Sequence, residues 1–126
     1  MVQKLTPNQI REIEAIQQFM RTVEHVKKLV SELESSRAAR PVIINNICGA
    51  IARELSQMRQ RALSANVGSL ADVAGSLAVL AARQGSGVGF KVRALAEGVN
   101  SLMIQLDQSL KSASQPEKAD PEQRSS

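Results

Sequence analysis

Residues 16–33 read IQQFMRTVEHVKKLVSEL, and the apolar side chains in this stretch recur at alternating intervals of three and four residues. The recurring positions are Ile16, Phe19, Val23, Val26, Val30 and Leu33. This spacing is a heptad seam, which places a stripe of apolar side chains along one face of an α-helix. Further apolar residues widen the stripe, namely Ile10, Ile13, Met20 and Leu29. A stripe of this width predicts a helix that contacts two neighbours in a bundle.

The first helix has a clear predicted start. Thr6 suits the N-cap and Pro7 the first helical position, and the helical period runs from there to about Ser36. A second helix follows the connection 35–41, with Pro41 in its first turn. Because residues 42–44 are β-branched, its start could also fall at Asn45 or Asn46. Its apolar period extends to about residue 65 through Ile44, Ile47, Ile51, Leu55, Met58 and Ala62.

Two more helices are predicted after a break at 66–68. Ser69 to Asp72 resembles a capping box, with Ser69 as the N-cap of a short, alanine-rich helix that ends near Arg83. Its predicted core positions are Leu70, Val73, Leu77 and Leu80. A glycine-rich loop covers 85–89. The last helix carries its apolar stripe from residue 88 to residue 110 through Val88, Val92, Leu95, Val99, Leu102, Leu106 and Leu110.

Four amphipathic helices joined by short connections predict an all-α fold, an antiparallel four-helix bundle over residues 1–111. Gly98 and the alanines of the third helix should let helix backbones approach closely. Residues 112–126 are almost devoid of apolar side chains, so we expect a disordered C-terminal tail. The third helix is several turns shorter than the first. We therefore expect the far end of the first helix to lack a partner within the chain, which favours a homo-oligomer.

Composition excludes several classes of protein. The chain has 126 residues, enough for one domain. Its single cysteine, Cys48, excludes an intramolecular disulfide and a zinc site with several cysteine ligands. No apolar run reaches the roughly 18 residues of a membrane-spanning helix. We therefore expect a cytoplasmic protein with no membrane partner.

His25 is the only histidine and the best candidate for chemistry. With Lys28 three residues later, it is similar to the phosphorylated histidine of phosphotransfer bundles, in which a cation holds the phosphate. Those proteins usually carry glycine four residues after the histidine, where this chain has Leu29. A solvated histidine beside the apolar stripe is the preferred interpretation, and phosphotransfer stays a distant alternative.

The other candidate chemical groups do not form a catalytic pattern. The carboxylates are scattered, and one histidine cannot supply the paired Glu-x-x-His ligands of a di-iron bundle. The glycines at 85, 87 and 89 match neither the dinucleotide fingerprint nor the P-loop. Cys48 is expected to be a buried or half-buried small side chain. We therefore predict a protein that is not an enzyme, with no catalytic residue, metal or cofactor.

Charge is concentrated in the middle of the chain. Residues 37–93 carry eight basic and two acidic residues, whereas the two flanking segments are balanced or acidic. We predict that an anionic partner, either nucleic acid or an acidic protein, contacts Arg40, Arg53, Arg59, Arg61, Arg83, Lys91 and Arg93. Aromatic residues make up 2% of the chain, which argues against base stacking and sequence reading of single strands.

The segment 46–72 resembles a family of bacterial four-helix bundles. Asn46-Ile47, then Arg53, then Gly68-Ser69-Leu70-Ala71-Asp72 are similar to motifs of the proteins encoded in ribosomal-RNA intervening sequences, a family that includes retroelement accessory variability proteins. The segment covers about a fifth of the chain, and Cys48-Gly49-Ala50 departs from the family pattern. The resemblance implies a ring-forming, basic, non-catalytic bundle that assists nucleic acid or its enzymes.

The sequence thus predicts a non-catalytic interaction or assembly protein that acts through helix faces and self-associates. The alternative is a basic accessory protein that binds a nucleic-acid backbone or a nucleic-acid enzyme.

Overall fold

The computed structural model describes residues 5–65, 68–83 and 87–115. Within these ranges the chain folds into four α-helices and no strand. They are α1 (Pro7–Ser35), α2 (Pro41–Ser64), α3 (Gly68–Ala82) and α4 (Val88–Ala113).

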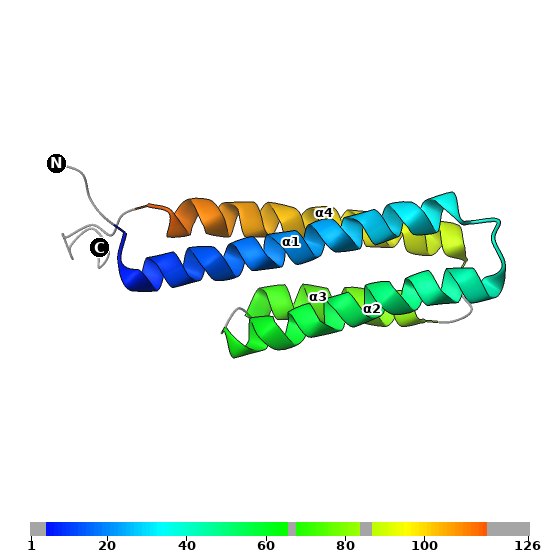
Figure 1. Cartoon of the computed structure of the whole chain (residues 1–126), viewed down its shortest axis with the longest axis horizontal. Coiled ribbons are helices and arrows are strands. Elements are labelled where there is room, and N and C mark those ends of the chain that lie inside the picture. The colour runs from blue at the N-terminus through cyan, green and yellow to red at the C-terminus, as the bar shows by residue number, and fades with distance from the viewer. Residues whose placement is uncertain (1–4, 66–67, 84–86, 116–126) are drawn as a thin grey trace.

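The helices pack side by side as a four-helix bundle, with successive helices running in opposite directions (Figure 1). α1 contacts α2 and α4, and α3 contacts the same two helices from the opposite corner. The pairs α1–α3 and α2–α4 are therefore diagonal. The predicted fold class is confirmed, and so is the prediction that α1 has two neighbours.

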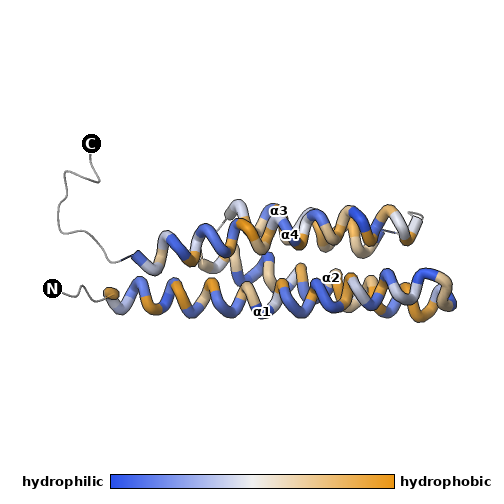
Figure 2. Tube along the Cα trace, turned by 90° about the horizontal axis from the view of Figure 1, so that it is seen from above, coloured by the Kyte–Doolittle hydropathy of each residue, from blue (hydrophilic) through white to orange (hydrophobic). Residues whose placement is uncertain are grey.

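The core is a single cluster along the bundle axis. Polar and apolar residues alternate along every helix (Figure 2), and the apolar ones turn inward. The six buried residues of α1 are the six residues of the predicted heptad seam: Ile16, Phe19, Val23, Val26, Val30 and Leu33. α2 buries Ile47, Cys48, Ile51, Leu55, Met58 and Ala62, which confirms the predicted seam except at half-buried Ile44.

Local signals place the helix starts. Thr6 caps α1 as predicted: its hydroxyl accepts a hydrogen bond from the Gln9 backbone at 3.1 Å, and the Gln9 side chain accepts one from the Thr6 backbone at 2.8 Å. α2 begins at Pro41 rather than at the later asparagines, with Arg40 as its N-cap. The predicted cap at Ser69 is wrong, because α3 already begins at Gly68 and Ser69 lies within its first turn.

The core face of α3 differs from the prediction. Val73 and Leu80 are only half-buried, whereas four alanines are fully buried beside Leu70 and Leu77. These are Ala71, Ala74, Ala78 and Ala81. Small side chains let α3 approach its neighbours closely, so the alanines fill the interface together with Leu70 and Leu77, while Val73 and Leu80 lie at its edges.

Gly98 allows the close approach of α3 and α4, as predicted. A Cβ atom added to Gly98 would lie 2.7 Å from Leu77 Cδ1 and 3.0 Å from Leu77 Cγ, closer than carbon atoms normally pack. Leu77 itself is buried at 7% exposure, so it occupies the space that a side chain on Gly98 would need.

The four helices do not end together. Figure 1 shows α1 and α4 running past the end of α2 and the start of α3, so the first turns of α1 pack only on the end of α4. A hollow of about 540 Å³ marks this step, with Ile16, Phe19 and Leu106 among its lining. Glu12 and Ser109 also line it, so polar residues lie where α2 and α3 no longer cover α1 and α4. The first helix thus extends beyond α2 and α3 as predicted from their lengths, but its end does not lack a partner within the chain, because α4 packs against it.

The bundle continues beyond its predicted end at residue 111. α4 reaches Ala113, which is buried at 4% exposure, and the Gln115 carbonyl accepts a hydrogen bond from Gln9 Nε2 at 2.6 Å. The first residues of the predicted tail 112–126 thus pack against α1. Residues 116–126 lie outside the described part of the chain.

Candidate functional site

The structure divides the seven predicted partner-binding cations into two groups. Arg53, Arg59 and Arg61 lie along α2 and are exposed. The other four, Arg40, Arg83, Lys91 and Arg93, lie at the end of the bundle where α2 and α4 begin and α3 ends. The charge-rich middle of the sequence is therefore not one continuous basic surface.

Lys91 belongs to the core rather than to the surface, which corrects its predicted role. It is 7% exposed, and its Nζ donates to the Ala81 carbonyl oxygen at 3.5 Å. Ala81 is in the last turn of α3, where backbone carbonyl groups lack helical partners and the helix dipole favours a cation. Lys91 thus joins the start of α4 to the end of α3 and is not available to a partner.

Replacing Lys91 by methionine tests this role. Methionine keeps the buried apolar stem but removes the ammonium group, so we expect the free energy of unfolding to fall by about 1 kcal/mol in urea denaturation. Arg93→Met changes an exposed cation two residues away and should alter stability by less than about 0.5 kcal/mol. Equal effects of the two changes would contradict a specific role for Lys91.

On α2, Arg59 also has a packing role. A Cβ atom at Gly75 of α3 would lie 2.8 Å from Arg59 Cδ and 3.1 Å from Arg59 Nε, so the arginine stem lies across this glycine. Arg53 stacks along its own helix, with Nη1 3.6 Å from the position of a Cβ on Gly49. At about 100° per residue, Arg53 and Arg59 point to sides of α2 about 120° apart. These arginines do not converge on one site.

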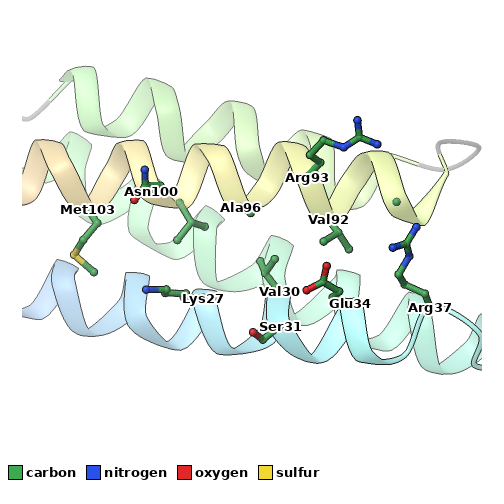
Figure 3. Close-up of a pocket in the computed structure, with 12 residues that line it drawn as sticks. Lys27, Val30, Ser31, Glu34, Arg37, Val92, Arg93, Ala96, Asn100 and Met103 are labelled. Carbon is green, nitrogen blue, oxygen red and sulfur yellow. The ribbon is translucent and has the colours of Figure 1, made fainter.

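A groove runs between α1 and α4 in the described part of the chain. It has a volume of about 410 Å³ and follows the outer seam of the two antiparallel helices (Figure 3). From Gly89 to Met103 it spans fifteen residues of α4, and the fourteen steps between them cover about 21 Å at about 1.5 Å per residue. Apolar side chains contribute to its lining, namely Val30, Val92, Ala96, Val99 and Met103.

Four charged residues surround this apolar floor. Lys27 and Glu34 come from α1, Arg37 from the α1–α2 connection and Arg93 from α4, so positive charge exceeds negative by two. In Figure 3 the Arg37 side chain crosses the end of the groove toward the first turn of α4, and Arg93 stands on the α4 rim with its guanidinium turned outward. Arg37 Nη2 lies 2.6 Å from the position of a Cβ on Gly89, so the glycine gives it room to cross.

The charges in the groove have no close partners among the described residues. Over residues 5–65, 68–83 and 87–115, no lysine or arginine nitrogen lies within 4.0 Å of a carboxylate oxygen, and the one contact of this kind joins His25 Nδ1 and Glu54 Oε1 at 3.3 Å. Lys27, Arg37 and Arg93 are therefore free to pair with an added anion.

Of these groove residues, the sequence prediction included Arg93 and missed Lys27 and Arg37. Their signal is a second heptad series on the outer side of α1, with Ile13, Met20, Lys27 and Glu34 at intervals of seven residues. On α4 the matching series contains Gly89, Arg93, Ala96, Asn100 and Met103. The α1 series is apolar near the N-terminus of the helix and charged near its C-terminus. The groove lies along the charged part of this series.

The candidate catalytic groups stay apart. His25 is exposed and lies against Glu54 of α2, as a solvated histidine would, and Leu29 one turn later is half-buried. Cys48 is buried at 4% exposure, as predicted. Within the described ranges no three His, Cys, Asp or Glu side chains gather as they would around a metal ion. The predicted absence of catalysis stays a prediction.

No described helix is both long and apolar enough to cross a membrane. Comparison of the chain with family models, with curated proteins and with solved structures gives no match. The resemblance of residues 46–72 to the intervening-sequence bundles therefore stays a prediction.

Proposed function

We propose that this protein is a non-catalytic interaction protein that docks an acidic, amphipathic helix of a partner protein in the α1/α4 groove. The proposal is supported by one observation above all: an elongated apolar floor between two antiparallel helices, bordered by unpaired cations. Two parallel ridges with a furrow between them are a surface on which a third helix packs. The apolar floor would accept one stripe of that helix, spaced at three and four residues.

The charges of the groove indicate the charge expected of the partner helix and where its acidic residues should lie. Arg37 at one end of the groove and Lys27 further along it favour acidic residues on both flanks of a docked helix. Glu34 opposes them locally, so the net preference comes from the excess of cations.

A nucleic-acid backbone fits the groove less well than an acidic helix. Phosphates would pair with the cations, but they gain nothing from covering the exposed apolar surface of Ala96 and Met103. An amphipathic helix uses both parts of the site, because its apolar side chains leave water while its carboxylates meet the arginines. The shape of the groove thus favours the acidic protein among the two predicted partners.

Peptide binding measured by fluorescence anisotropy tests the proposal. The probe is a labelled helical peptide of about 14 residues, matching the groove at about 1.5 Å per residue, with leucines at heptad spacing and glutamates elsewhere. Its control has lysine in place of every glutamate. We expect the acidic peptide to bind and the basic one not to bind.

Two single changes in the groove should act in opposite directions. Lys27→Gln removes an attractive charge and should weaken the acidic peptide about threefold, whereas Glu34→Gln removes a repulsive charge and should tighten it about threefold. Both residues are exposed, so the fold should survive. Equal binding of the acidic and basic peptides, or changes of the same sign in the two variants, would contradict the proposal.

Self-association is the second candidate, favoured by apolar residues on the same outer face. Ile104 of α4 is 52% exposed, and Met20 and Leu110 are only partly buried. A second copy packed on this face would cover them together with the groove. Light scattering over a range of concentrations separates the two cases, because a dimer would compete with the peptide and a monomer would leave the groove free.

A further inference from the structure

One end of the bundle carries an excess of positive charge. Its described residues 35–46, 82–83 and 87–93 lie where α1 and α3 end and α2 and α4 begin (Figure 1). These 21 residues contain four arginines and one lysine but no aspartate or glutamate, and the nearest acidic residue in sequence is Glu34, which precedes them on α1. The first of these ranges is far in sequence from the other two, so the fold alone brings their charges to the same end.

Three of the arginines lie on or next to elements that meet at the start of α4. Arg37 reaches this turn at Gly89, where its Nη2 lies 2.6 Å from the position of a Cβ. The bond from Lys91 Nζ to the Ala81 carbonyl holds the end of α3 against the same turn, and Arg83 follows Ala81 by two residues. Arg93 lies one turn further along α4 and is exposed. Arg37 and Arg93 thus flank the first turns of α4, and Arg83 follows the end of α3 that Lys91 joins to the same helix.

Phe90 lies in the first turn of α4, and its side chain is exposed. It is 57% exposed, whereas Phe19, the other aromatic residue, is buried at 5%. Phe90 and Arg93 are three residues apart on α4, so they project about 60° from each other at about 100° per residue. An exposed aromatic ring beside arginines offers both a stacking surface and partners for phosphate.

We infer that this end of the bundle binds single-stranded nucleic acid without sequence preference. Arg37, Arg83 and Arg93 pair with successive phosphates, and a base stacks on Phe90. The inference goes beyond the docking of an acidic helix, because Phe90 and Arg83 do not line the groove. It also revises the sequence argument against stacking: the scarcity of aromatic residues matters less than the exposure of this one.

The cluster fits a nucleic-acid strand better than an anionic membrane. Two aliphatic side chains are exposed at the same end, Val42 at 61% and Ile43 at 45%, and a bilayer would bury them. They belong to α2, however, which is diagonal to α4 in the bundle and makes no contact with it among the described residues. Val42 and Ile43 therefore lie on a helix diagonal to the one that carries Phe90 and Arg93.

Titration of the full chain with a labelled oligothymidylate, about 12 nucleotides long, tests the inference. We expect binding at about 50 mM salt that weakens steeply by about 200 mM. Arg83→Gln should weaken the binding of the oligonucleotide. It should also lower the slope of log affinity against log salt concentration by about 0.7, which is the contribution of one phosphate contact on a single strand. Arg61→Gln on α2 is the matched control and should leave both values unchanged, because Arg61 is an exposed arginine outside the cluster.

Changes at Phe90 separate stacking from simple apolar contact. Phe90→Leu keeps apolar bulk but removes the aromatic face, and it should weaken the oligonucleotide at least about fivefold, as the loss of one stacked base does. The double change Val42→Ser and Ile43→Ser should have no effect. All these side chains are exposed, so circular dichroism should show an unchanged helical fold.

Several results would overturn the inference. Absence of binding at low salt would remove it, as would full binding by Phe90→Leu or an equal loss in Arg61→Gln. Co-sedimentation with phosphatidylserine-containing vesicles tests the alternative that this end of the bundle binds an anionic membrane. If vesicles bind and the Val42→Ser, Ile43→Ser variant loses them while the oligonucleotide fails to bind, this end contacts a membrane instead.

Discussion

Replacing Leu55 by alanine is expected to lower the free energy of unfolding by about 3 kcal/mol, one of the largest effects of any single change in this chain. Leu55 lies in the middle of α2 and is fully buried in the core cluster. The change removes three carbon atoms from contact with the other helices and leaves a cavity that a close-packed core fills only in part. Chemical denaturation followed by circular dichroism measures the loss.

The same substitution at Leu63 is the matched control. Leu63 belongs to the same helix but is 48% exposed, so Leu63→Ala should change stability by less than about 1 kcal/mol. The same substitution at two leucines of one helix should thus lower the free energy of unfolding by different amounts, because only one of the two side chains faces the core. Similar losses for both changes would show that the seam of α2 is not where the heptad pattern places it.

Gly98→Val is expected to destabilise the protein by about 2 kcal/mol through overpacking. The added side chain would meet Leu77 of α3, whose Cδ1 and Cγ lie 2.7 and 3.0 Å from the Cβ position. Because Leu77 is itself buried, it cannot move aside without disturbing the α3–α4 interface. Thermal denaturation monitored by circular dichroism measures the effect.

Gly49→Val provides the comparison for Gly98. The nearest side-chain atom to a Cβ at Gly49 is Arg53 Nη1 at 3.6 Å, an ordinary contact with a flexible group. Valine also has a slightly better helix propensity than glycine, so this change should leave stability within about 0.5 kcal/mol of the parent protein. A loss at Gly49 as large as that at Gly98 would contradict the close approach of α3 and α4.

The fold was predictable because one physical rule dominates it. Apolar residues at spacings of three and four on α1 can leave water only against other helices, and the structure buries all six of them. The rule failed on α3, where Val73 and Leu80 have the right spacing but alanines take the interface. Spacing identifies a helical face and its approximate direction, whereas the distance between two helices decides which side chains fit at the centre.

The candidate sites were only partly predictable, because they depend on which residues meet across helices. The charge pattern predicts Arg93 and Arg83 as site residues, but it also predicts Lys91. Lys91 is buried against the end of α3, and no sequence pattern indicates this burial. Arg37 was not predicted as a site residue, because its role depends on its side chain reaching Gly89 of α4, which is distant from it in the sequence. The exposure of Phe90 likewise follows from its position on α4 relative to the neighbouring helices.

Nuclear magnetic resonance mapping of the acidic peptide on the labelled protein tests the proposed docking groove most directly. If the groove is the docking site, the amide signals that shift during the titration should belong to residues 27–37 and 89–103, and those of the outer faces of α2 and α3 should stay in place. Shifts concentrated on α2 and α3, or spectra that do not change as peptide is added, would contradict it.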